Sequence, residues 1–135
     1  MATIRKEIRT NARPEDVWAA IRDIGALHTR LVPGFVVDTR LEPGCRIVTF
    51  GNGAVVREPI VTIDDAARRL VWSAQSGRTT HYNASAQAFD DGVGGTRVVW
   101  LADLLPDEAA RDIDVAMEMG AGVMKKTLDS LARQG

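Results

Sequence analysis

The sequence has a single cysteine, Cys45, and two histidines, His28 and His81, among its 135 residues. A lone cysteine excludes an internal disulfide bond, and these three side chains lack the spacing of a zinc or haem site. We therefore expect neither a resident metal ion nor a cofactor. Carboxylates leave one route open for a metal that prefers oxygen ligands.

Net charge and aromatic side chains are also scarce. The formal net charge at pH 7 is -1, and the chain has three Trp, one Tyr and three Phe. Such a surface has no excess of positive charge to attract phosphate backbones or anionic lipids, and few rings are available to stack on bases. Nucleic acid is therefore not expected as a partner.

Long apolar runs are missing as well. Charged residues interrupt every short apolar stretch of Met1–Thr10, and no segment approaches the roughly 18 consecutive apolar residues of a membrane span. These patterns argue against a secretory signal and against stable membrane insertion. The composition, 45% apolar and 26% charged, is that of an ordinary globular domain. We expect one domain over residues 1–135, in a cytoplasmic protein with a reduced thiol.

Hydrophobic periodicity predicts the order of the elements. Thr3–Thr10 alternates apolar and charged residues like a half-buried strand, a helix follows from Pro14 to Gly25, and Ala26–Leu31 forms a further short turn. Successive strands are then predicted at Phe35–Leu41, Arg46–Phe50, Val55–Ile63, Leu70–Gln75, His81–Phe89 and Arg97–Asp103. The turns between them are short, which indicates an antiparallel meander, because parallel strands need helical crossovers.

A long amphipathic helix is predicted last, because apolar residues recur every three or four positions between Pro106 and Arg133. A sheet of this many strands must curl, and only this helix has an apolar stripe large enough to cover its concave face. The predicted fold class is α+β, a seven-stranded curved antiparallel sheet wrapped around a long C-terminal helix, with one or two short helices after the first strand.

Four stretches, in this order and spacing, resemble a known family. They are Ala12–Trp18 with Ile21 and Asp23, Val32–Gly34, Gly95–Trp100 and the helix after Pro106, and His81–Ser85 adds to them. The chain resembles the START/Bet v 1-like (SRPBCC) superfamily, specifically its bacterial polyketide cyclase/dehydrase and lipid-transport branch. The resemblance implies a helix-grip fold around a cavity, and a shared cavity shape rather than a shared catalytic motif. A cystatin-like cone is the competing fold, but such chains begin with their long helices.

Strand parity indicates which side chains face the cavity. The inward sets are Leu70, Trp72 and Ala74; Tyr82, Ala84, Ala86 and Ala88; Val98, Trp100 and Ala102. The same argument turns Phe35, Val37, Thr39 and Leu41 inward. His81, Asn83, Ser85 and Gln87 then lie on the convex, solvated face, unless a bulge reverses the register and makes them a polar cavity lining.

We expect a ligand to contact large aromatic walls together with small or flexible side chains that leave space. The expected ligand-binding residues are Phe35, Glu58, Trp72, Tyr82, Ala84, Trp100, Met117, Gly120 and Met124. The alternative is a filled core in which the alanines accommodate Met and Trp. The two glycines of the long helix, Gly120 and Gly122, predict a close approach of helix to sheet or a kink.

No catalytic motif is present, and Glu58 and Tyr82 are the candidates for a catalytic role. If Glu58 points inward, burial would raise its pKa and suit it to general acid or base chemistry. The other interpretation is that Glu58 is paired with an arginine or is solvated near the pocket mouth.

Three functions are compatible with these features. The first is binding of a hydrophobic or amphipathic small molecule, such as a polyketide, lipid or isoprenoid. The second is a cyclase or dehydratase-like enzyme that uses one proton-transferring group in the cavity, and the third is a protein-interaction module whose cavity is unused. A monomer and a homodimer both stay open.

Overall fold

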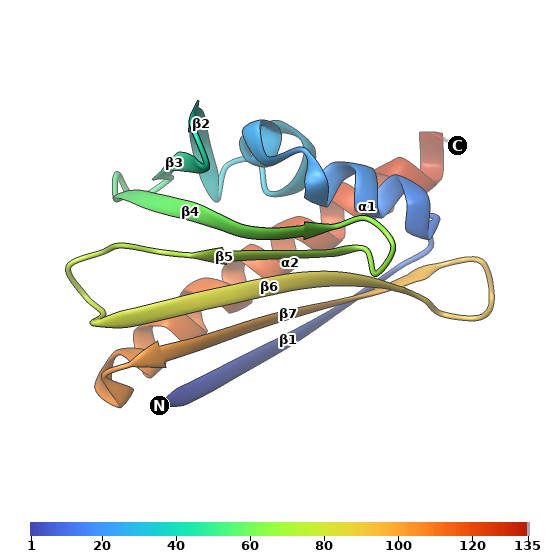
Figure 1. Cartoon of the computed structure of the whole chain (residues 1–135). Coiled ribbons are helices and arrows are strands. Elements are labelled where there is room, and N and C mark those ends of the chain that lie inside the picture. The colour runs from blue at the N-terminus through green and yellow to red at the C-terminus, as the bar shows by residue number, and fades with distance from the viewer. Residues whose placement is uncertain (135) are drawn as a thin grey trace.

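Seven strands form one antiparallel sheet in the computed structural model, which describes residues 1–134; residue 135 of the expected domain lies outside this description. The strands are β1 (Ala2–Thr10), β2 (Val36–Glu42), β3 (Cys45–Phe50), β4 (Val55–Asp64), β5 (Arg69–Ser73), β6 (His81–Asp90) and β7 (Thr96–Leu105). Their order across the sheet is β1-β7-β6-β5-β4-β3-β2. The predicted meander is confirmed, with β1 added beside β7 (Figure 1).

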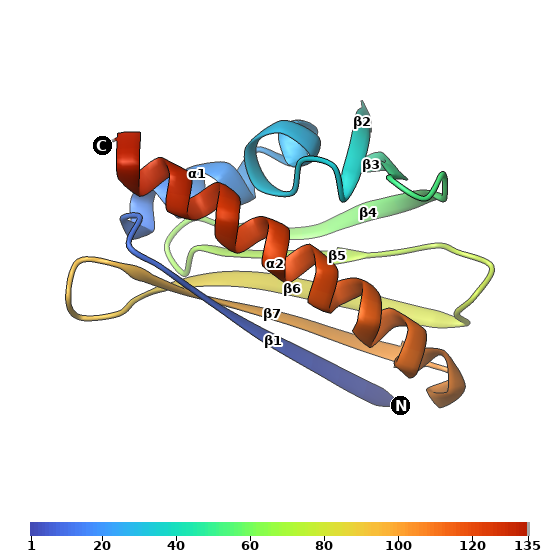
Figure 2. The ribbon, with the colours of Figure 1, turned by 180° about the vertical axis from the view of Figure 1, so that it is seen from behind.

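The helices lie before and after the meander. α1 (Pro14–Arg22), η1 (Ile24–Ala26) and η2 (Leu27–Leu31) connect β1 to β2, and η3 (Asp107–Ala109) leads into α2 (Ala110–Gln134). The 25-residue α2 is long enough, at about 1.5 Å per residue, to cross the sheet. Figure 2 shows it lying diagonally over the concave face. The predicted helix-grip fold is therefore confirmed. Within residues 1–134, no helix has the length and apolarity that crossing a membrane requires.

The inner face of the sheet follows the predicted alternation over its central strands. Most residues of β5, β6 and β7 that are predicted to face inward are buried, and Tyr82 is partly buried. The buried ones are Leu70, Trp72, Ala84, Ala86, Ala88, Val98, Trp100 and Ala102. α2 contributes Met117, Met124 and Leu128 to the same core. Burial of this apolar surface is the main force that holds the helix on the sheet.

The inward face predicted for Phe35–Leu41 is wrong in part. A bulge between Val36 and Asp38 shifts the register of β2 against β3. Val36 is buried as a result, whereas Val37 is 53% exposed. Beyond the bulge the predicted face holds, because Thr39 Oγ1 lies 3.0 Å from His28 Nδ1 of η2 and Leu41, although 55% exposed, lies against Gly25 of η1. β2 is also an edge strand, so its side chains have neighbours on one side of the strand only.

The polar residues at the start of β6 lie on the convex face. His81 Nε2 lies 2.7 Å from Asn83 Oδ1, and Asn83 donates a 3.2 Å hydrogen bond to Asp103 of β7. Thr3 of β1 donates a 2.6 Å bond to the same carboxylate. Neither His81, Asn83 nor Ser85 lines the cavity described below. The parity prediction is confirmed for these residues, and the reversed register is wrong.

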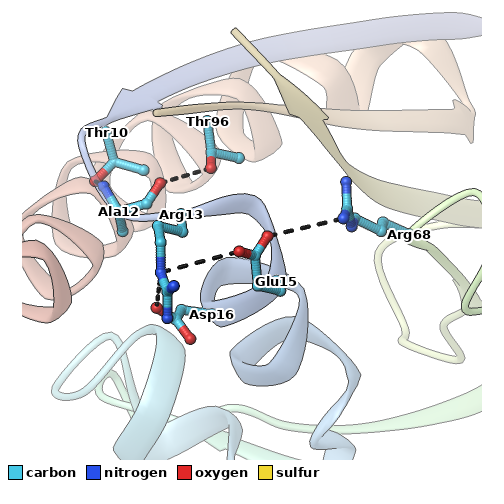
Figure 3. Close-up of polar contacts among 7 residues, drawn as sticks. All are labelled: Thr10, Ala12, Arg13, Glu15, Asp16, Arg68 and Thr96. Carbon is cyan, nitrogen blue, oxygen red and sulfur yellow. Dashed lines mark hydrogen bonds and ion pairs between the residues drawn. The ribbon is translucent and has the colours of Figure 1, made fainter. Parts of the chain in front are cut away.

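Two of the stretches that carry the family resemblance meet just before α1 (Figure 3). Thr96 donates a 2.6 Å hydrogen bond from Oγ1 to the carbonyl of Ala12, and the Ala12 N–H donates a 3.2 Å bond to Thr10 Oγ1. All three residues are buried. The chains approach so closely that a Cβ at Gly95 would lie 2.6 Å from the Thr10 carbonyl oxygen. This seam of Thr10, Ala12 and Thr96 fixes the point where α1 leaves the sheet.

The side chains of α1 tie the helix to the turn between β4 and β5. Trp18 Nε1 and Arg22 Nε both donate to Asp65 Oδ1, at 2.9 and 2.8 Å, and these two donors lower the pKa of Asp65. Glu15 faces Arg68 at 3.8 Å (Figure 3). Exposed pairs such as this last one contribute little free energy, so the Trp18 contact is the stronger tie.

The seam gives a direct test of stability. Replacing Thr96 by Val keeps its shape but leaves the buried Ala12 carbonyl without this donor, and we expect a loss of about 1 to 3 kcal/mol in the free energy of unfolding. Thr96→Ser keeps the hydroxyl and is the control. Urea denaturation followed by circular dichroism measures both variants. Equal or greater stability of the Val variant would contradict the role given to this hydrogen bond.

Candidate ligand-binding cavity

A cavity of about 190 Å³ lies between the concave face of the sheet and α2. Its wall consists mainly of apolar side chains from η2, from the inner face of strands β2 to β7 and from one side of α2. The expectation of space, rather than of a filled core, therefore holds in the structure. Small side chains explain it, because Ala86 and Ala116 lie on the wall between larger neighbours.

Most of the expected ligand-binding residues lie on this wall. Those that line the cavity are Phe35, Glu58, Trp72, Tyr82, Trp100, Met117 and Met124. Ala84 and Gly120 are buried but do not line it. A Cβ at Gly120 would come within 2.9 Å of Phe35 and 3.1 Å of Trp100. Gly120 thus permits close contact of α2 with the sheet, whereas Gly122 has no such neighbours, and nothing in the structure explains it.

Arg46 is the residue that sequence reasoning missed. It is 2% exposed, lines the cavity, and donates a 2.8 Å hydrogen bond from Nε to Glu58 Oε1. Its guanidinium also lies over the ring of Trp72, 5.2 Å from the centroid. Arg46 and Glu58 are direct cross-strand partners on β3 and β4. The sequence contained one sign of this ion pair, because an arginine and a glutamate stand on two successive predicted strands.

The ion pair decides between the two interpretations of Glu58. Glu58 points inward and is 6% exposed, as the acid or base interpretation requires, and it is also paired with an arginine, as the other interpretation holds. Burial raises the pKa of Glu58, and the charge and hydrogen bond of Arg46 oppose that rise. Solvation near the pocket mouth is excluded by this burial.

Tyr82 adds a hydroxyl to the same end of the cavity. Burial, and in second place the negative charge of Glu58, raise the pKa of Tyr82 above its ordinary value. Its phenol therefore stays protonated at neutral pH and can donate a hydrogen bond to an oxygen atom. The indole N–H of Trp100 is a second donor in this wall, and it is buried without an acceptor among the described residues.

The cavity reaches the surface beside the loop between β5 and β6. Ser76, Arg78 and Thr79 of this loop belong to the lining and are partly or fully exposed. Ile113 and Ala116, from the N-terminal half of α2, face the same end. Figure 2 shows this loop and the start of α2 at the same end of the molecule.

The arrangement of the described side chains gives no indication of a metal centre. Over residues 1–134, no three or more His, Cys, Asp or Glu side chains group in a way that could hold a metal ion. Cys45 is buried with a free thiol.

Comparison with solved structures identifies the fold. The protein XoxI from Bacillus cereus superimposes with a TM-score of 0.81 at 19% identity, covering 96% of this chain and 94% of that chain. A Thermobifida fusca protein is 28% identical, with a TM-score of 0.73 and coverage of 99% and 93%. The Zhui aromatase/cyclase from a Streptomyces species has a TM-score of 0.75 at 14% identity, with coverage of 98% and 94%.

Comparison of the sequence identifies the family. None of the curated proteins compared with this chain matches it. The family model described as polyketide cyclase/dehydrase and lipid transport matches residues 1–134. With the helix-grip fold and the cavity in place, the chain belongs to this family.

Proposed function

We propose that the protein binds a small hydrophobic or amphipathic molecule in the cavity between the sheet and α2. The observation that carries this proposal is an apolar cavity of about 190 Å³ with polar side chains at one end. An apolar cavity of about 150 Å³ holds benzene, and sites for drug-sized ligands start at about 300 Å³. The space therefore suits a ligand of about one or two rings, such as a small aromatic polyketide or a short isoprenoid.

The polar end favours a ligand that carries a neutral oxygen. Arg46 and Glu58 neutralise one another, so the pair presents no net charge to a ligand. Tyr82 has a protonated hydroxyl next to this pair and can donate to a carbonyl or hydroxyl oxygen. Apolar walls hold the rest of the molecule but discriminate weakly between similar hydrocarbons. We infer that Tyr82 orients the ligand.

A cyclase or dehydratase-like enzyme is the second candidate. It is favoured by the presence of Glu58 and Tyr82 in one cavity, because burial raises the pKa of the Glu58 carboxyl towards the neutral range, where general acid and base catalysis is most effective. Glu58, held by Arg46 at 2.8 Å, is then the group that moves the proton, whereas Tyr82, whose pKa is raised away from neutral pH, stabilises negative charge on an oxygen atom by donating a hydrogen bond. Tyr82→Phe with ligand binding retained and turnover of a polyketone thioester lost would select this function.

Filling the cavity tests the binding proposal. Ala86→Leu places a larger side chain on the cavity wall, and we expect it to weaken binding of the fluorescent bicyclic 2-naphthol by about tenfold or more, because the added atoms occupy the ligand's volume. Val71→Leu adds bulk on the opposite face of the sheet and is the matched control. Titration of 2-naphthol fluorescence measures both variants. If the two variants bind equally well, the cavity is not the binding site.

Removing one hydroxyl tests the orienting role of Tyr82. The loss of one hydrogen bond of about 0.5 to 1.5 kcal/mol predicts that Tyr82→Phe weakens 2-naphthol binding about two- to tenfold. Naphthalene lacks the oxygen, so its affinity should stay within about twofold. Competition between the two compounds on wild type and variant gives both values. If the affinity for naphthalene fell as much as that for 2-naphthol, Tyr82 would contribute packing against the ligand and no hydrogen bond.

The buried ion pair is tested by breaking it and then removing it. Arg46→Met leaves the Glu58 carboxylate buried and uncompensated, and we expect a destabilisation of about 3 to 5 kcal/mol. The double variant Arg46→Met/Glu58→Leu should recover most of the lost free energy of unfolding, because it leaves no buried charge without a partner. Lowering the pH should also reduce the loss in Arg46→Met, because burial raises the pKa of Glu58 and protonation removes the unpaired charge.

An exposed pair that joins β4 to β2 provides the control for this experiment. Arg57 Nη1 lies 2.7 Å from Glu42 Oε1 with both side chains partly exposed. Arg57→Met should reduce the free energy of unfolding by less than about 1 kcal/mol. Urea denaturation at several pH values measures the set. Equal losses for Arg46→Met and Arg57→Met would contradict the burial argument.

A further inference from the structure

The mouth of the cavity holds a positive charge that pairs with no carboxylate of residues 1–134. Among the described residues that line the cavity, three are charged: Arg46, Glu58 and Arg78. Arg46 and Glu58 neutralise one another, whereas Arg78, in the loop between β5 and β6, takes part in none of the ion pairs of residues 1–134. Two arginines and one glutamate give the lining a net charge of +1. The whole chain has the opposite sign, with a formal net charge of -1.

The loop that carries Arg78 is fixed at both ends. Before it, the Gln75 N–H donates a 2.9 Å hydrogen bond to the carbonyl of Arg57 on β4. After it, the Thr80 N–H donates a 2.8 Å bond to the carbonyl of Leu105 at the end of β7. Residues 76–79 therefore form a short connection between two anchored points, which keeps Arg78 beside the opening of the cavity.

Two hydroxyl groups accompany the Arg78 guanidinium. Ser76 and Thr79 belong to the same part of the lining and are partly exposed. Ser76 Oγ accepts a 3.2 Å hydrogen bond from the Arg78 N–H, so its own hydrogen can be donated to another acceptor. A guanidinium can donate two parallel hydrogen bonds to a carboxylate or a phosphate, and such charge-assisted bonds are stronger than neutral ones. The mouth is therefore equipped to bind an acidic group.

The position of Arg78 allows an acidic group to bind without losing all of its water. A carboxylate taken fully into the apolar part of the cavity would lose its hydration, which is costly for a charged group. Arg78 is exposed, so an acidic group that binds it at the mouth keeps part of its hydration. The apolar remainder of the molecule can then lie in the cavity, where Tyr82 can donate to a neutral oxygen.

The number of charges favours a carboxylate over a phosphate. A carboxylate has one negative charge and balances the single excess positive charge of the lining. A phosphate monoester has a charge of about -1.5 to -2 at pH 7, so part of its charge would have no partner among the lining residues.

We propose that the ligand is an amphipathic carboxylate, with its apolar part in the cavity and its carboxylate bound by Arg78 at the mouth. This inference rests on the proposed function, because it requires a ligand in the cavity. Ser76 and Thr79 donate further hydrogen bonds to the same carboxylate. The ligand class is therefore an aromatic or isoprenoid acid rather than a neutral hydrocarbon or alcohol.

Two probes that differ in one group test the proposal. 2-Naphthoate and 2-naphthol have the same two rings, and competition between them shows whether they share one site. Arg78→Gln should lower the ratio of 2-naphthoate affinity to 2-naphthol affinity about threefold or more, because the carboxylate loses its charged partner. Arg78→Glu should lower this ratio further, because like charges then face one another. Fluorescence titrations of both probes measure the ratio.

A second arginine provides the matched control. Arg69 of β5 is exposed and does not line the cavity, so Arg69→Gln makes the same change in net charge away from the mouth. It should leave the affinity ratio within about twofold, because exposed charges at a distance are screened by salt. Added salt should also weaken the binding of 2-naphthoate to the wild type more than that of 2-naphthol, and this difference should be smaller in Arg78→Gln.

Several outcomes would overturn the proposal. A wild type that binds 2-naphthol but not 2-naphthoate has a cavity for neutral ligands, and the proposed function would then stand without this inference. An affinity ratio that is unchanged in Arg78→Gln, or that falls equally in Arg69→Gln, would show that Arg78 does not bind the carboxylate. Tighter binding of 2-naphthyl phosphate than of 2-naphthoate would overturn the choice of a carboxylate. If neither 2-naphthol nor 2-naphthoate binds, the proposed function itself fails.

Discussion

The contact of Gly120 with Phe35 and Trp100 sets the distance between α2 and the sheet. No side chain larger than hydrogen fits at that point without displacing an aromatic ring. The helix is held close to the sheet there, while Ala86 and Ala116 leave space nearby. The cavity therefore follows from an uneven distribution of side-chain volume along α2 and the inner face of the sheet. A uniform layer of leucines in the same fold would fill the space that a guest needs.

The polar end of the cavity is compatible with this apolar setting because its charges are paired. Arg46 lies between the Glu58 carboxylate and the Trp72 ring, so its charge interacts with both an anion and an aromatic face. Replacing such a pair by apolar side chains often leaves stability unchanged or improves it. Stability alone therefore gives no reason for the pair, and the ligand binding proposed above would give it a role.

Much of the fold was predictable from periodicity. Alternation in β5, β6 and β7 is regular, so parity identified Trp72, Tyr82 and Trp100 as inward-facing. It failed at β2, because a bulge adds one residue and alternation in the sequence contains no sign of it. Arg46 was missed for a different reason: β3 has apolar residues on both faces, so its pattern does not single out one inner face. The cavity itself depends on packing between elements far apart in the sequence.

The seam of Thr10, Ala12 and Thr96 lies away from the cavity, and none of its residues belongs to the lining. The seam therefore belongs to the scaffold, where it attaches α1 and begins β7, whereas other residues of the stretches that carried the family resemblance, among them Ile21 and Trp100, line the cavity. A substitution in the cavity lining can therefore leave this attachment of α1 unchanged. One attachment of α1 is thus compatible with different cavity linings, in keeping with a family description that names cyclisation, dehydration and lipid transport side by side.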